Sequence, residues 1–148
     1  MDFNEIIANF AAKYKVENLV AIDGAAALDI DGSIVTIVAK NEELNFSAEI
    51  GDPPAEGAAT FANLLLEANM QSGAFFAKAP DPGPYIAVRR LQLSLVDDES
   101  FESALESFVN QVETWRRLLA DYRPIAKAST ERAKEEQPPF GMSGFMKA

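Results

Sequence analysis

The sequence of 148 residues contains neither histidine nor cysteine. The absence of histidine removes the commonest general base and metal ligand, and with it every catalytic arrangement that pairs His with Ser, Cys or a metal. The absence of cysteine excludes disulfides and thiolate metal sites. Catalysis would have to rest on carboxylates, lysine or tyrosine, which is a minority case among enzymes. The composition therefore predicts a protein that is not an enzyme and has no metal or other cofactor.

Basic residues are also scarce, 13 against 23 acidic ones, which gives a formal net charge of −10. Residues 125–148 hold four of the basic and three of the acidic residues, so residues 1–124 carry −11. A field of that sign repels nucleic acid and anionic membranes, and we expect neither as a partner. It favours solubility and can steer a basic or neutral polypeptide toward the chain.

Long apolar runs are missing, since none approaches the roughly 20 residues of a membrane span. The first residues, Met1 to Glu5, carry acid where a secretory signal carries base. We therefore expect a cytoplasmic protein without membrane insertion.

Ligand-binding motifs are missing as well. The glycines fit neither GxGxxG nor GxxxxGK[ST], the common phosphate-binding spacings. The stretch Asp29-Ile30-Asp31-Gly32 resembles part of a calcium loop, but the other spaced ligands and the closing glutamate are absent. We interpret these aspartates as turn residues.

The periodicity of the apolar residues predicts a helix first and then strands. Residues at three- and four-residue spacing form one apolar stripe near the start: Phe3, Ile6, Ile7, Phe10, Ala11 and Tyr14. Asp2 and Glu5 are spaced as a capping box for this helix. The period then changes to two, and Asp23-Gly24 and Asp31-Gly32 are hairpin signals. The expected strands are Ala25–Ile30, Ser33–Ala39 and Glu43–Ile50, the last with one apolar and one polar face.

The second half of the chain repeats this change of period. A helix is expected over residues 57–69, followed by strands Ala74–Ala79 and Tyr85–Leu91. Leu91, Leu93 and Leu95 continue an alternating pattern, as a bend or a further short strand. Asp97-Asp98-Glu99 then begins the longest helix, which Pro124 ends. Residues 1–124 are thus expected to form one α+β domain, an antiparallel sheet with three helices, and residues 125–148 a flexible tail.

Several stretches in this order resemble the class I type III secretion chaperones, the Tir chaperone (CesT) family. They are LDID (28–31) followed by IVTI (34–37), LNFSAEIGDPP (44–54), LLLEAN (64–69), and FESALESFV (101–109) leading to Trp115. The resemblance covers roughly residues 3–122 and implies the fold α-βββ-α-ββ(β)-α in a homodimer.

The resemblance also implies a function. Such a chaperone binds the N-terminal region of a secreted effector in the bacterial cytoplasm and keeps it extended and secretion-competent, without catalysis. An effector can add a strand to a sheet edge and place apolar side chains in grooves. The effector-binding residues we predict are Ile34, Thr36 and Val38, because the strand 33–39 is apolar on both faces and these lie on its spare face, and Phe10 and Tyr14 at the rim of the first helix. Those predicted for the dimer interface are Leu66, Asn69, Met70, Phe76, Ile86 and Val88.

Other functions remain open at this point. A sheet that packs on a long helix can enclose a small-molecule cavity. A carboxylate-dependent enzyme would need two carboxylates that converge in a cleft. An adaptor with the same fold would sequester a regulatory protein instead of an effector.

Overall fold

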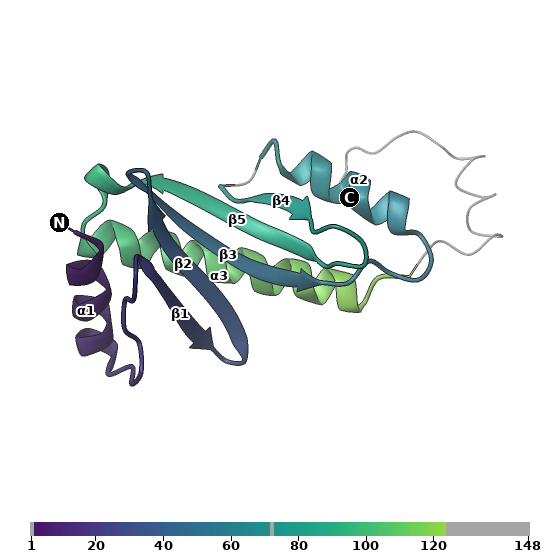
Figure 1. Ribbon diagram of the computed structural model, residues 1–148. Helices are drawn as coiled ribbons and strands as arrows, with labels where there is room; N and C mark the ends of the chain where they lie inside the picture. The colour runs from purple at the N-terminus through teal and green to yellow at the C-terminus, as the bar shows by residue number, and fades with distance from the viewer. Residues whose placement is uncertain (1, 72, 124–148) are drawn as a thin grey trace.

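The computed structural model describes residues 2–71 and 73–123, which form one antiparallel sheet with helices on one of its faces (Figure 1). The strand order is β1-β2-β3-β5-β4. The elements, in chain order, are α1 (Phe3–Tyr14), β1 (Ala25–Ile30), β2 (Ser33–Lys40), β3 (Glu43–Gly51), α2 (Ala58–Ala68), β4 (Phe75–Lys78), β5 (Tyr85–Gln92), a short 3₁₀ helix (Leu93–Leu95) and α3 (Asp98–Ala120). The predicted fold class is confirmed, and every predicted helix and strand is present within a few residues of its expected bounds.

Local sequence explains the meander of β1, β2 and β3. Asp31 and Gly32 both have positive φ, 51° and 85°, as a type I′ hairpin turn requires. Asn41 and Glu42 form the second turn with φ of 52° and 64°, although neither residue is glycine. The pairing of Asp29 with Ile34 and of Lys40 with Glu43 follows from these two-residue turns.

Helix α3 covers one face of the sheet and forms the core with it. Phe46 on β3 contacts the rings of Phe101 and Phe108 on α3, with centroids 5.7 and 5.6 Å apart. All three phenylalanines are buried. Helix α3 begins with a capping box, in which Asp97 and Ser100 exchange hydrogen bonds.

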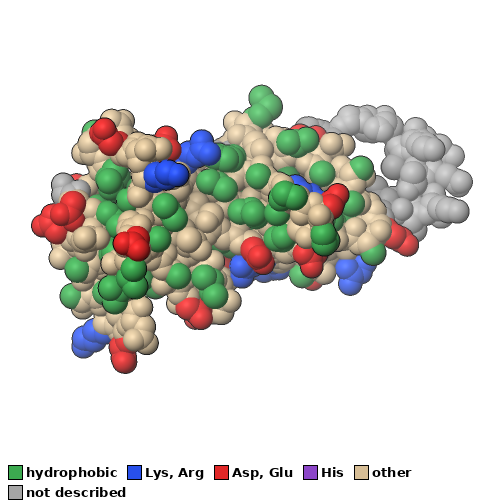
Figure 2. All heavy atoms as spheres, viewed as in Figure 1, with side chains coloured by type: hydrophobic (Ala, Val, Ile, Leu, Met, Phe, Trp, Pro, Cys, Tyr) green, Lys and Arg blue, Asp and Glu red, His purple; other side chains and the backbone are tan. Residues whose placement is uncertain are grey.

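The opposite face of the sheet, which we call the outer face, has no helix over it within residues 2–71 and 73–123 (Figure 1). Figure 2 views the molecule from this side and shows hydrophobic side chains over the middle of the sheet and over α2 and β4, among scattered acidic groups. The outer face of β2 is apolar, as predicted, because Ile34 lies there with 57% of its surface exposed.

Of the two alternatives expected for Leu93 and Leu95, the structure has the bend and not the further strand, because residues 93–95 form a 3₁₀ turn that leads into α3. The predicted tail of residues 125–148 lies outside the described residues, so its extent stays a prediction. The homodimer also stays a prediction.

Candidate functional site: a groove between α1, α3 and the edge of the sheet

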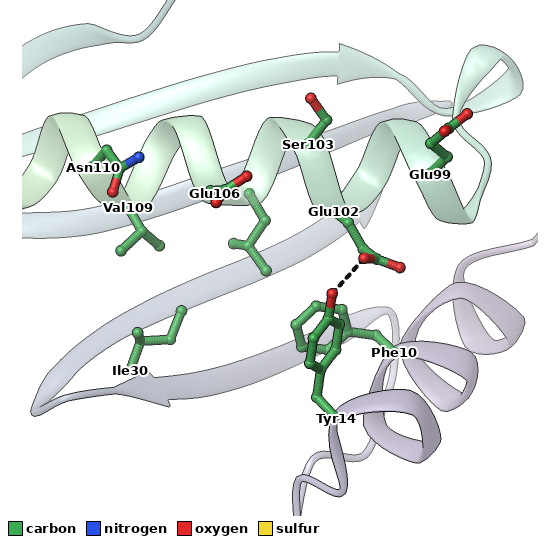
Figure 3. Close-up of a pocket in the computed structure, with 10 residues that line it drawn as sticks. Phe10, Tyr14, Ile30, Glu99, Glu102, Ser103, Glu106, Val109 and Asn110 are labelled. Atoms are coloured by element: carbon green, nitrogen blue, oxygen red, sulfur yellow. Dashed lines mark hydrogen bonds between the residues drawn. The ribbon is translucent and has the colours of Figure 1, made fainter.

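A groove of about 440 Å³ lies between α1, α3 and the end of β1 (Figure 3). Its apolar lining comes from Phe10, Ile30, Leu105 and Val109, together with the ring of Tyr14. Figure 3 shows Phe10 and Tyr14 reaching from α1 toward α3, and Ile30 opposite Val109 at the end of β1. The groove lies where α3, which packs mainly on β3, leaves Ile30 at the end of β1 partly exposed, whereas Ala26 and Leu28 earlier on the strand are buried.

Acidic and polar side chains of α3 surround this groove. They are Glu99, Glu102, Ser103, Glu106 and Asn110. Glu102 is paired with Lys13, whereas neither Glu99 nor Glu106 forms an ion pair within residues 2–71 and 73–123. The groove thus offers an apolar floor and a negative rim, which favours a segment with apolar side chains and basic neighbours.

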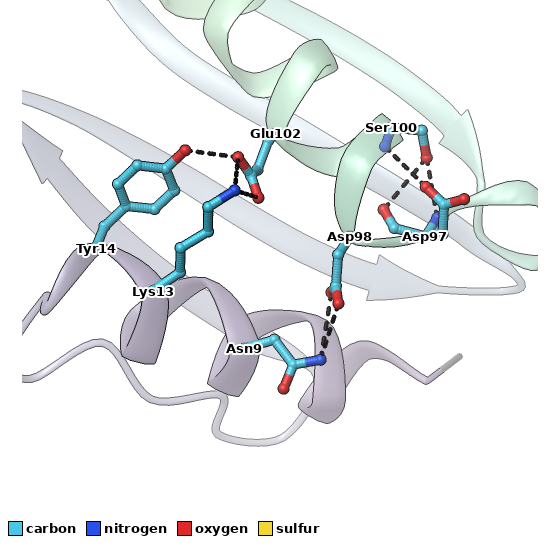
Figure 4. A network of polar contacts seen from close by, with 7 residues as sticks. All are labelled: Asn9, Lys13, Tyr14, Asp97, Asp98, Ser100 and Glu102. Atoms are coloured by element: carbon cyan, nitrogen blue, oxygen red, sulfur yellow. Dashed lines mark hydrogen bonds and ion pairs between the residues drawn. The ribbon is translucent and has the colours of Figure 1, made fainter.

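A polar network fixes α1 against α3 at one end of the groove (Figure 4). Lys13 Nζ donates to both carboxylate oxygens of Glu102 at 3.0 Å, and Tyr14 Oη donates to Glu102 Oε1 at 2.5 Å. Asn9 Nδ2 donates to the carboxylate of Asp98, one turn earlier on α3. Because Glu102 accepts from both partners, its pKa is lowered, mainly through the Tyr14 hydrogen bond, and the pKa of Tyr14 is raised by the same bond.

The groove adjoins a free edge of the sheet. Strand β1 is the first strand of the sheet and pairs with β2; on its other side, within residues 2–71 and 73–123, the one bridge is between its first residue, Ala25, and Ile22. Ile30 is both the last residue of β1 and part of the groove lining. An extended polypeptide that bonds to the outer edge of β1 would therefore have the groove beside it.

The other edge of the sheet is covered by a side chain of its own chain. Asn69, just after α2, accepts from the backbone N–H of Phe76 at 2.7 Å and donates to its carbonyl at 3.2 Å. Both groups belong to β4, the last strand. The amide of Asn69 thus occupies edge groups of β4 with which another strand would pair.

A second groove, of about 460 Å³, lies on the outer face of the sheet. It is lined by Gly32, Ile34, Thr36, Ser47, Ala48, Glu49, Ile86 and Arg116. Ile34 and Thr36, which we predicted for effector binding, therefore share a groove with Ile86, which we predicted for the dimer interface. Val38 lies further along β2, opposite Asn45, and does not line this groove.

The remaining residues predicted for the interface have different surroundings. Leu66 and Met70 are exposed, at 62% and 88%, and Val88 is half-buried on the outer face opposite Phe75. Phe76 is instead buried, with 5% exposed, and its ring contacts Trp115 of α3 at 5.2 Å. Asn69 uses its amide on β4, as described above.

Phe10 and Tyr14, which the sequence predicts together for effector binding, both line this groove. Ile30 and the acidic rim are not among the predicted residues, and the sequence pattern indicates Glu99 only as part of a helix cap. The spacing of Glu99, Glu102 and Glu106 at three and four residues does place them on one side of a helix, and this signal was available.

Other kinds of site are not found in the described part of the chain. Among residues 2–71 and 73–123, no three His, Cys, Asp or Glu side chains are grouped as a metal site. None of the helices there is both long and apolar enough to cross a membrane.

The fold is that of type III secretion chaperones of known structure. A chain in the crystal structure of the ExsC–ExsE complex matches with a TM-score of 0.69 and 22% identity, over 80% of this chain and 97% of that one. The HopA1–SchA chaperone–effector complex matches with a TM-score of 0.66 and 14% identity, over 78% of this chain and 93% of that one. The structure of the Yersinia pestis type III secretion chaperone SycH, in complex with a stable fragment of YscM2, matches with a TM-score of 0.62 and 21% identity, over 77% of this chain and 99% of that one.

At such identities these structures establish the fold alone. The family follows from the sequence: the model of the Tir chaperone protein (CesT) family matches residues 5–116, and the chain belongs to this family. The resemblance noted in the sequence is thereby confirmed. A comparison with curated protein sequences finds no match.

Proposed function

We propose that this protein is a cytoplasmic bacterial chaperone that binds the N-terminal region of a type III secreted effector and acts without catalysis. The observation that carries the proposal is the groove between α1 and α3 beside the free edge of β1. Membership of the Tir chaperone family supports it, as does the likeness to chains from chaperone–effector complexes.

The groove and the edge suit an extended segment. Main-chain groups of such a segment would bond to the outer edge of β1, and every second side chain would then point to the core side of the sheet. Apolar side chains on that side would meet Phe10, Ile30 and Val109. A chain held extended in this way cannot close its own core, which keeps it competent for secretion.

The outer face provides a second contact surface for the effector. Ile34 and Thr36 line its groove and are exposed, and Val38 continues the same face of β2. A polypeptide that passes over the β1 edge would reach this face from the groove. We therefore keep Phe10, Tyr14, Ile34, Thr36 and Val38 as the effector-binding residues and add Ile30.

The homodimer interface that we propose uses the other half of the outer face and α2. Leu66, Met70 and Val88 supply accessible apolar surface there, and Ile86 borders it from the groove that it shares with Ile34 and Thr36. Asn69 and Phe76 serve this interface indirectly, because they fix α2 to β4 and β4 to Trp115. Residues 1–124 form the folded unit in this proposal, and residues 125–148 a tail attached to it.

Co-expression with candidate effectors encoded nearby, followed by co-purification and native mass measurement, tests this function. We expect a complex of two chaperone chains with one effector segment. A chain that stays monomeric and captures no secreted polypeptide would refute the proposal. Stable capture of a regulatory protein instead, with no effector bound, would favour the adaptor function over the chaperone function.

A variant pair locates the effector site. Ile34→Asp places a charge on an exposed position, so the protein should fold and dimerise but lose at least tenfold in effector affinity. Leu95→Asp is the matched control, because Leu95 is also exposed but lies outside both grooves and away from β1. Equal effector affinity of both variants would show that Ile34 does not contact the effector.

A further inference from the structure

One apolar segment of the sequence lies outside the described residues. Residues 137–148 read QPPFGMSGFMKA and contain Phe140, Met142, Phe145 and Met146. The segment has no acidic side chain, although the whole chain carries a net charge of −10, and its single charged side chain is Lys147. Its chemistry is therefore apolar and basic.

The groove beside α1 has the complementary chemistry. Its floor is formed by Phe10, Ile30, Leu105 and Val109, and methionine and phenylalanine side chains pack well against aromatic and aliphatic groups of this kind. Its rim carries Glu99 and Glu106, which have no ion-pair partner in residues 2–71 and 73–123. Lys147 would be attracted by this rim.

The chain is long enough to bring the segment to this groove. The described residues end at Arg123, just past the end of α3, and Glu106 lies 17 positions earlier. At about 1.5 Å per helical residue, the separation along α3 is about 25 Å. Residues 124–139 can extend to roughly 50 Å at about 3.3 Å each, so the connection is long enough even where it does not run straight.

We propose that residues 140–146 of each chain occupy that chain's own groove when no partner is bound. The tail then shields the apolar floor from unrelated polypeptides, and an effector segment must displace it. The proposal uses the groove of the proposed function but does not depend on which polypeptide is the partner.

The absence of cysteine makes a direct test possible, because Ser143→Cys creates a unique site for a nitroxide spin label. We expect the label to broaden the methyl signals of Ile30 and Val109 in the full-length protein. The signal of Leu66 on α2, at the other end of the molecule from α1 (Figure 1), should stay sharp. Adding Phe140→Ser and Phe145→Ser to the labelled chain should restore the Ile30 signal.

The control carries the label at Ser129→Cys, outside the apolar segment, and should leave Ile30 sharper than the label at 143 does. Equal broadening of Ile30 and Leu66, or broadening of Ile30 that survives the two Phe→Ser changes, would overturn the proposal. Tenfold dilution with unlabelled natural protein, mixed by unfolding and refolding, tests whether the tail that broadens Ile30 belongs to the same chain or to another copy. Broadening that persists shows docking within one chain, and broadening that disappears shows docking between copies and contradicts the proposal.

A functional measurement follows from the same competition. If the tail occupies the groove 80–90% of the time, F140S/F145S should bind an effector about five- to tenfold more tightly. The matched control Ser129→Ala should bind as the natural protein does. The spin-label experiment needs no effector, so a failure of tail docking and a failure of effector binding are seen separately.

Discussion

The Nε atom of Arg116 on α3 donates a hydrogen bond of 2.7 Å to the carbonyl oxygen of Glu49 on β3. The same guanidinium donates through Nη1 to the hydroxyl of Ser33 on β2, a polar side chain that is buried. The paired register of β2 and β3 runs from Thr36–Ser47 to Lys40–Glu43 and does not reach Ser33. Arg116 therefore joins the two strands where their own pairing stops.

Replacement of Arg116 by methionine should lower the free energy of unfolding by about 1 to 2 kcal/mol. The change keeps the apolar stem but removes two charge-assisted hydrogen bonds, and it leaves the Ser33 hydroxyl without this partner. Urea unfolding followed by the fluorescence of Trp115 measures the effect.

The neighbouring Arg117 is the matched control, because it is exposed and its side chain makes no comparable contact with the sheet. Arg117→Met should change stability by less than about 0.5 kcal/mol. Equal losses of unfolding free energy for the two variants would show that stability depends on the positive charge at the end of α3 and not on the hydrogen bonds from Arg116 to β2 and β3.

The fold was predictable because its signals are local. Asp31-Gly32 specifies a turn, alternation specifies β3, and the apolar stripe from Phe101 specifies α3; each can be recognised within a short stretch. Arg116 carried no such signal. Its partners Ser33 and Glu49 lie 83 and 67 residues away, and only the packing of α3 across the sheet brings them together.

The groove was only half predictable for the same reason. Phe10 and Tyr14 stand out as aromatic residues at the end of an amphipathic helix. Ile30 instead looks like an ordinary strand residue, and its exposure to a groove depends on how far α3 lies from β1. The other wall of the groove depends on how α1 lies against α3, which is fixed by contacts such as the one from Lys13 to Glu102, 89 residues apart.

Asn69→Ala should destabilise the protein by about 1 to 2 kcal/mol, because two hydrogen bonds to Phe76 are lost and the backbone edge of β4 opens. The exposed edge should also promote aggregation. Chemical unfolding and light scattering measure the two effects. Asn63→Ala, an exposed asparagine of α2, is the control and should change neither quantity. If Asn69→Ala weakened the dimer without loss of stability, Asn69 would be a direct interface residue.

Val88→Asp should convert the proposed dimer to monomers, which sedimentation or native mass spectrometry would detect. Val88 lies opposite Phe75 on β4 and opposite Ser47 on β3, so the new charge would be buried in an interface that uses this half of the outer face. Thr36→Asp is the matched control, since Thr36 also pairs with Ser47 but from the β2 side. It should leave the dimer intact and weaken effector binding. A dimer that persists in Val88→Asp would show that the interface lies elsewhere.

Glu102→Gln should lower the pKa of Tyr14 toward the ordinary tyrosine value of about 10. In the natural protein the neutral hydroxyl donates to the Glu102 carboxylate, which raises the pKa of Tyr14; the pKa of Lys13 is raised by the same carboxylate.

The contribution of Tyr14 to stability is therefore complete below about pH 10 and is lost as the pH rises through its folded-state pKa. The pKa of Glu102 is lowered, so its contribution is complete above about pH 4.5 and is lost as the pH falls through its folded-state pKa. The contact between α1 and α3 should thus be strongest between these limits, and Glu102→Gln should flatten the stability profile at both ends. NMR titration of the Tyr14 ring, with Glu106→Gln as the control on the same rim, measures the change; an unaltered Tyr14 pKa in Glu102→Gln would show that the contact does not hold the two helices together in solution.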